Sequence, residues 1–140
     1  MIRTNTNLNR LDHKSIRKIV ELTIQYCQAH MGINRRRGEC GVIVTNQSPT
    51  AEQQRYGEYC PEYHIIRLFK NNIDNVRCLI ETTIHEYTHT LQPVKTKYMK
   101  LLEVHGYDNH PMEIEAVKNE ALINEVWPTI RKKLTKVKLD

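Results

Sequence analysis

The sequence lacks several features that would place it in a special class of protein. No apolar run approaches the roughly 20 residues that a helix needs to cross a bilayer. The first residues, Met1 to Asn5, carry no apolar stretch of the kind found in signal peptides. There is no internal repeat, low-complexity segment or interdomain linker. We therefore expect one domain over residues 1–140, located in the cytoplasm and not attached to a membrane.

The four cysteines lack a metal-binding pattern. Cys27, Cys40, Cys60 and Cys78 include no C-x-x-C pair, and their spacings match no zinc ribbon. Free cysteine packs as a small apolar side chain, so we expect reduced thiols that are mostly buried or half-buried. A Cys40–Cys60 disulfide is the alternative, but nothing in the sequence indicates an oxidising compartment.

The chain has an excess of positive charge without a pattern typical of nucleic-acid binding. Its formal net charge is +5, and basic residues cluster at residues 35–37 and 131–138. Aromatic residues do not alternate with these clusters, and no motif of a nucleic-acid-binding fold is present. We interpret the clusters as a solvated face and a basic tail over residues 132–140. Weak attraction to nucleic acid or to acidic partners is the alternative.

Apolar periodicity predicts an α+β fold, in which a short sheet packs on one side against helices. Residues 1–11 are polar and rich in Asn, and we expect them to form a loose lead-in. The predicted elements are a helix over about 13–31, strands over 41–45 and 62–69, and helices over 76–91, about 94–104 and 111–126. Residues 46–59 are expected to form a loop, with a helical turn near 51–55 as an option.

Capping residues and prolines set the expected helix ends. Asp12 is a candidate N-cap of the first helix, and Gly32 is suited to its C-terminus. Asn72 and Asp74 are candidate N-caps of the helix over 76–91, and Pro93 stands just beyond its end. Pro111 suits the first position of the last helix, which we expect Trp127-Pro128 to kink or restart.

The centre of the chain is His85-Glu86-Tyr87-Thr88-His89, an H-E-x-x-H pattern. Because an α-helix turns about 100° per residue, His85 and His89 share one face and can both bind one metal ion. Glu86 lies beside them and can act as a general base on a metal-bound water. Two imidazoles and a base are typical of zinc hydrolases, so we expect Zn²⁺ as the cofactor. Coincidence in a chain with seven histidines, or an inactive metal site, is the alternative.

The last predicted helix contains the best candidate for a third ligand. Catalytic zinc takes three protein ligands and leaves one position for water. Helical periodicity places Glu113 within the apolar face of this helix and Glu115 toward solvent. A carboxylate directed into a core is costly unless it is paired or bound to a metal, so we expect Glu113 to be the ligand. Glu120 lies on the same face, either as an acceptor for a ligating imidazole or as an ordinary surface residue.

Together, the two motifs resemble the gluzincin group of zinc metallopeptidases, and most closely the small single-domain minigluzincins. The resemblance covers about residues 60–121, through the stretch from His85 to Gln92 and a looser one from Tyr107 to Ala116. Similar stretches occur in uncharacterised H-E-x-x-H proteins of phages and bacteria; a phage-encoded chain would reside in the host cytoplasm.

The resemblance implies a zincin-like metallopeptidase domain with zinc on His85, His89 and Glu113 and with Glu86 as the base. It also implies that the strand from His64 to Phe69 borders the substrate cleft and pairs with an extended peptide. Many gluzincins place Asp, Asn or Glu four residues after the ligand Glu, and here that position is Val117. Asn119 stands in this relation to Glu115, which keeps Glu115 open as an alternative ligand.

A second resemblance is to SprT-like proteases, in which H-E-x-x-H is followed by a His-Gly pair that supplies the third ligand. His105-Gly106 follows His89 by sixteen residues. The regular helix predicted over residues 98–104 disfavours this alternative, as does Asn109 where an aromatic residue would follow. For both His105 and His110, a role in a turn or a helix cap is the competing interpretation.

The sequence thus predicts a zinc-dependent metallopeptidase that hydrolyses a peptide or protein substrate. Tyr98, His105 and Tyr107 are candidates for a second donor to the oxyanion, and the sequence does not choose among them. The alternatives are a zinc protein of gluzincin shape that binds or scaffolds with little turnover, and a DNA-associated SprT-like protease that uses His105. Cleavage specificity and oligomeric state are not indicated by the sequence.

Overall fold

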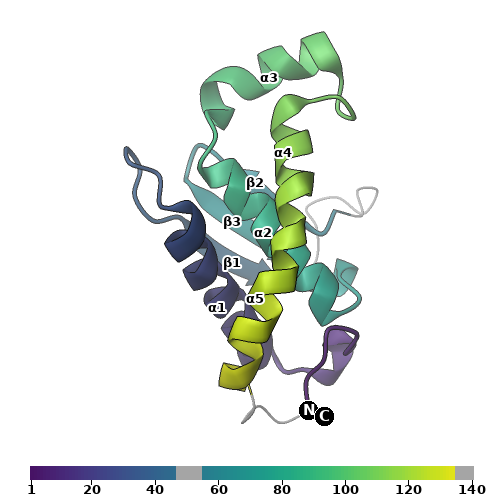
Figure 1. The fold of residues 1–140 in the computed structure, drawn as a ribbon. Coiled ribbons are helices and arrows are strands. Elements are labelled where there is room, and N and C mark those ends of the chain that lie inside the picture. Colours follow the sequence, from purple (N-terminus) through teal and green to yellow (C-terminus); the bar gives the residue numbers. More distant parts are fainter. Residues whose placement is uncertain (47–54, 135–140) are drawn as a thin grey trace.

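Helices and a small sheet make up the fold, which is α+β (Figure 1). The computed structural model describes residues 1–46 and 55–134. The helices are α1 (His13–Met31), α2 (Val76–Thr90), α3 (Val94–His105), α4 (Pro111–Asn119) and α5 (Ile123–Ile130), and the strands are β1 (Gly41–Thr45), β2 (Gly57–Cys60) and β3 (Ile65–Phe69). Short 3-10 helices are η1 (Leu8–Arg10), η2 (Lys70–Asn72), η3 (Glu120–Leu122) and η4 (Arg131–Leu134). Among the helices of the described residues, none has the length and apolar composition of a membrane span.

The sheet has the strand order β1-β3-β2, so β3 is its central strand. β1 pairs with β3 in parallel and β2 pairs with β3 antiparallel. The prediction of a loop over residues 46–59 is therefore wrong at β2, and the predicted strand over 62–69 begins only at Ile65. A Cβ atom at Gly57 would lie 2.8 Å from the backbone oxygen of Arg67, so β2 approaches β3 at a glycine that looks like a loop residue in the sequence. The optional helical turn near residues 51–55 falls almost entirely outside the described residues.

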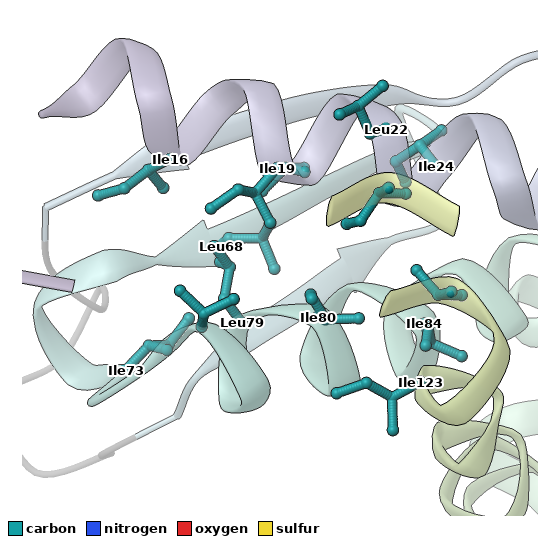
Figure 2. Close-up of a cluster of buried hydrophobic side chains, with 14 of the residues drawn as sticks. Ile16, Ile19, Leu22, Ile24, Leu68, Ile73, Leu79, Ile80, Ile84 and Ile123 are labelled. Atoms are coloured by element: carbon teal, nitrogen blue, oxygen red, sulfur yellow. The ribbon is translucent and has the colours of Figure 1, made fainter. Parts of the chain in front are cut away.

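The core lies between one face of the sheet and the helices (Figure 2). As predicted, α1 buries a stripe of residues spaced by three and four: Ile16, Ile19, Val20, Thr23 and Cys27. α2 and α5 contribute Leu79, Ile80, Ile84, Ile123, Val126 and Ile130. On the opposite face of the sheet, Ile43 is 43% exposed.

The first eleven residues are packed, and the expectation of a loose lead-in is wrong. Ile2, Leu8 and Leu11 are buried in the core. The backbone N–H of Leu8 donates to Asp74, and those of Val76 and Arg77 donate to Thr6 and Thr4, at 2.8–3.0 Å. The carbonyls of Thr4 and Thr6 therefore accept hydrogen bonds from the first turn of α2, whose N–H groups have no partner within the helix.

The start of α2 and the course of the last predicted helix differ from the predicted boundaries. The N-cap of α2 is Asn75, whose side chain accepts from the backbone N–H of Cys78, rather than Asn72 or Asp74. The last predicted helix is interrupted at η3, and Pro128 lies within α5 without ending it. Pro128 has no N–H to donate to the carbonyl of Asn124, which is an exposed residue.

The remaining boundaries agree with the sequence patterns. Asp12 caps α1 by accepting from Ser15 at 2.7 Å, and Gly32 ends that helix with a φ of 88°. Residues 132–134 of the predicted basic tail belong to η4, where Leu134 is buried, and residues 135–140 lie outside the described residues. All four cysteines are free. Burial raises the pKa of the Cys27 thiol to about 12, which keeps it protonated.

Candidate metal centre

Helix α2 is the platform of the site. Its fifteen residues contain neither Gly nor Pro, and Leu79, Ile80 and Ile84 hold one side of it in the core. The Tyr87 hydroxyl donates to the carbonyl of Gly32 at 2.6 Å and fastens the C-terminal half of α2 to the end of α1. His85 and His89 project from another side, toward α4.

Three of the predicted ligand side chains lie next to one another. Oε1 of Glu113 is 2.9 Å from Nε2 of His85 and 3.0 Å from Nε2 of His89. One ligand atom from each residue lies within 4.8 Å of the other two. Glu113 is only 8% exposed, and it comes from the first turn of α4, where Pro111 starts the helix. The cluster thus joins α2 and α4, because Glu113 lies 24 residues after His89 and 28 residues after His85 in sequence.

Both imidazoles are oriented by an acceptor on their second nitrogen. Nδ1 of His85 lies 2.9 Å from Oε2 of Glu120, and Nδ1 of His89 lies 2.7 Å from Oε1 of Gln92. A carboxylate and an amide oxygen only accept hydrogen bonds, so each Nδ1 must carry the proton. Once each imidazole gives up the Nε2 proton that it donates to Glu113, the Nε2 lone pairs can bind a cation beside that carboxylate. Such outer acceptors are typical of histidines that bind zinc. The donor set therefore fits a zinc ion.

The charges of the cluster shift the pKa values of its members. Burial disfavours the charged form of His85, but its hydrogen bonds to Glu113 and Glu120 outweigh burial and raise the pKa of His85 to about 10. Burial also acts to raise the pKa of Glu113, but hydrogen bonds from His85, His89 and Tyr98 hold it well below its usual range. In the absence of a cation, the protein thus keeps a proton on the histidines to balance the carboxylate.

Glu86 is buried beside the cluster, with 7% of its surface exposed. Burial raises the pKa of its carboxyl group, and the two histidines partly oppose that rise. No described residue donates a hydrogen bond to this carboxylate. A buried carboxylate with a raised pKa is suited to take up a proton and pass it on.

Helix α3 is fastened to the cluster mainly through Tyr98. The Tyr98 hydroxyl donates to Oε2 of Glu113, and the Tyr98 ring stacks on that of His110 with the centroids 4.1 Å apart. His110 is fully buried; its Nε2 donates to the carbonyl of Tyr98, and its Nδ1 accepts from the backbone N–H of Met112 at the start of α4. His110 is thus a capping residue. No residue of α3 itself is fully buried.

The alternative third ligands lie outside the cluster. His105 is exposed at the end of α3, and Glu115 is exposed on α4. Glu115 accepts from Nε2 of Gln92 at 2.8 Å and so supports the side chain that orients His89. Sequence reasoning missed Gln92, which lies three residues after His89, in the bend between α2 and α3.

The strand expected to pair with a substrate peptide is not free to do so. Residues 65–69 form β3, whose two edges are taken by β1 and β2, so the expectation that this strand pairs with a peptide is wrong. The sheet edge beside α2 is β2, where Gly57 packs against the side chain of Thr82. The turn before β3 is fixed by His64, which has a φ of 54°. Its Nε2 donates to the carbonyl of Gly38, and its Nδ1 accepts from the Tyr59 hydroxyl.

Comparison with known proteins gives no relative: no protein-family model, no curated protein and no solved structure matches the chain.

Proposed function

We propose that the chain is a zinc-dependent peptidase of the gluzincin type. The observation that carries the proposal is the convergence of two Nε2 atoms and one carboxylate oxygen within 4.8 Å, beside a buried glutamate from the same helix. His85, His89 and Glu113 would hold the zinc ion. When bound, zinc supplies a water of lowered pKa and polarises a carbonyl group.

The protein's own residues would divide the remaining work. Glu86 takes the proton of the attacking water on its carboxylate and then donates it to the leaving amine. Glu120 and Gln92 hold the imidazoles at the tautomer and angle that metal binding requires. Tyr98 fixes the second oxygen of Glu113 so that the first stays directed at the histidines.

A peptide substrate is supported by the edge strand β2. Among the described residues, no strand pairs with the side of β2 that faces away from β3. A strand edge offers unpaired N–H and C=O groups, to which an extended peptide can add. β2 also packs against α2, at Gly57 and Thr82, so a peptide on this edge would lie beside the metal-bearing helix.

Metal content and peptide cleavage test the proposal. Purified wild type should hold one zinc per chain by elemental mass spectrometry, and Glu113→Ala should lose it while Glu115→Ala and His105→Ala retain it. A mixed peptide library should be cleaved by wild type and not by Glu86→Gln, which should keep its zinc. Zinc binding without cleavage of any peptide would leave a binding protein, and loss of zinc in His105→Ala would refute the assigned ligand set.

A further inference from the structure

One buried histidine near the metal centre is not among the candidate ligands. His110 lies between α3 and α4, and its side chain is fully buried although it is polar. Burying a polar ring is costly unless its nitrogens are hydrogen-bonded. His105, the other histidine of this segment, is exposed. The burial of His110 therefore has to be explained by what its ring contacts.

Both ring nitrogens of His110 are hydrogen-bonded, and only one tautomer fits. Nδ1 lies 3.1 Å from the backbone nitrogen of Met112, whose N–H can only donate, so Nδ1 accepts and carries no proton. Nε2 then carries the proton and donates to the carbonyl of Tyr98 at 2.9 Å. A neutral imidazole offers an acceptor and a donor on one rigid ring. His110 thus connects the start of α4 with α3.

The ring of His110 also holds the ring of Tyr98. The two rings stack with an interplanar angle of 28° and with their centroids 4.1 Å apart. Tyr98 also meets the ring of His89 edge-on, with the centroids 6.2 Å apart. Because α3 has no fully buried residue, the packing of the helix itself does little to place Tyr98. His110 therefore holds Tyr98 at two points, the backbone carbonyl and the ring.

Glu113 receives its position from His110 by two routes. In the backbone, His110 is the N-cap of α4, and its carbonyl accepts from the N–H of Ile114 at 2.9 Å, so the turn that carries Glu113 starts at His110. Among the side chains, His110 holds Tyr98, whose hydroxyl donates to Oε2 of Glu113. The other oxygen, Oε1, is the one that lies beside the two histidines of α2.

We infer, on the basis of the proposed function, that His110 is a positioning residue of the zinc site: it holds Tyr98 in place, and Tyr98 holds the carboxylate of Glu113 toward the metal. Zinc as the bound metal comes from the proposed function, whereas the contacts of His110 do not depend on it. A side chain that only accepts, such as ionised Asp, or only donates, such as Lys, cannot make both hydrogen bonds. His110 thus acts on zinc affinity without touching the metal.

The hydroxyl proton of Tyr98 gives a test that needs no metal. Its hydrogen bond to Glu113 slows exchange with water, so metal-free wild type should show this proton by NMR. His110→Asn keeps an acceptor for the start of α4, because Asn is a good N-cap, but it lacks the ring that stacks on Tyr98. The signal should disappear in this variant and remain in His30→Asn, which removes an exposed histidine stacked on Tyr26 in α1. A signal that is absent from wild type, or that persists in His110→Asn, overturns the inference.

A double-mutant cycle on zinc affinity tests whether His110 acts through Tyr98. Tyr98→Phe keeps the ring but removes the hydroxyl, and it should weaken zinc binding roughly tenfold, at the lower end of the range for groups that orient a ligand. His110→Asn should weaken zinc binding by a similar factor in wild type and change it little in Tyr98→Phe, whereas His30→Asn should leave it unchanged.

Two outcomes of the cycle overturn the inference: effects of the two changes that multiply, and a Tyr98→Phe variant that binds zinc as wild type does. The second of these is decisive even if His110→Asn does not fold. Failure of wild type to bind zinc would refute the proposed function, and the hydroxyl signal of Tyr98 would still decide whether His110 holds that side chain.

Discussion

Replacing Glu120 should weaken zinc binding although Glu120 is not a ligand. Its Oε2 accepts from Nδ1 of His85 at 2.9 Å and fixes the orientation of that imidazole. Removing such an acceptor typically costs 10- to 100-fold in metal affinity, or about 1.4–2.8 kcal/mol. The Glu120 side chain is 29% exposed, so water can partly replace it. We therefore expect Glu120→Ala to weaken zinc binding by roughly tenfold.

A competition titration against a chromophoric zinc chelator measures this affinity. Glu120→Gln keeps an oxygen acceptor but loses the charge, so its affinity should fall between those of wild type and Glu120→Ala. Glu125→Gln, which removes an exposed charge in the next helix, is the matched control and should bind as wild type does. Thermal melting of each zinc-free variant checks that the fold is kept. A Glu120→Ala affinity within twofold of wild type would refute the orienting role.

Three further predictions address the base, protonation and the packed N-terminus. Glu86→Gln should keep zinc but cleave peptides about 10²- to 10⁴-fold more slowly in a fluorogenic assay, and cleavage at the wild-type rate would exclude Glu86 as the base. The raised pKa of His85 stabilises the metal-free protein below pH 6.5, and this contribution is lost as the pH rises toward about 10. The lowered pKa of Glu113 stabilises it above pH 4.5, and this contribution is lost as the pH falls. Urea unfolding of the metal-free protein should therefore show the largest contribution of His85 and Glu113 to the free energy of unfolding between pH 4.5 and pH 6.5. If the difference in stability between wild type and Glu113→Gln does not vary with pH, the coupling is contradicted. Leu8→Ala should reduce the free energy of unfolding by about 2–5 kcal/mol, since Leu8 is 3% exposed, whereas Ile33→Ala at an exposed site should change it little.

The features that were predictable from the sequence are those that local patterns determine. The spacing of Ile16, Ile19 and Val20 sets α1, and Pro111 sets the start of α4. The direction of Glu113 and Glu115 follows from the apolar periodicity of the same helix, because a buried carboxylate stands out against its neighbours. The side chains that meet at the candidate metal centre were therefore identifiable before their contacts were known.

The features that were missed depend on contacts between distant segments. β2 is short and begins at a glycine, and it is a strand only because β3 lies beside it. Asn72, Asp74 and Asn75 are equivalent caps by residue type. The choice of Asn75 coincides with its bridge to Asn7, which a local pattern cannot show. Ile2 and Leu8 are isolated apolar residues in a polar segment, so no periodicity revealed their burial.

The packing of residues 4–8 against the first turn of α2 links the order of synthesis to the helix that carries His85 and His89. These residues leave the ribosome about seventy positions before Asp74, Val76 and Arg77, with which they form backbone hydrogen bonds. They must stay unpaired while α1 and the sheet are made, and they can take their places only once α2 has emerged. A nascent chain halted before α2 would therefore display Ile2 and Leu8 without a core to cover them. Packing of the amino-terminal segment and completion of α2 would then be one late event in folding.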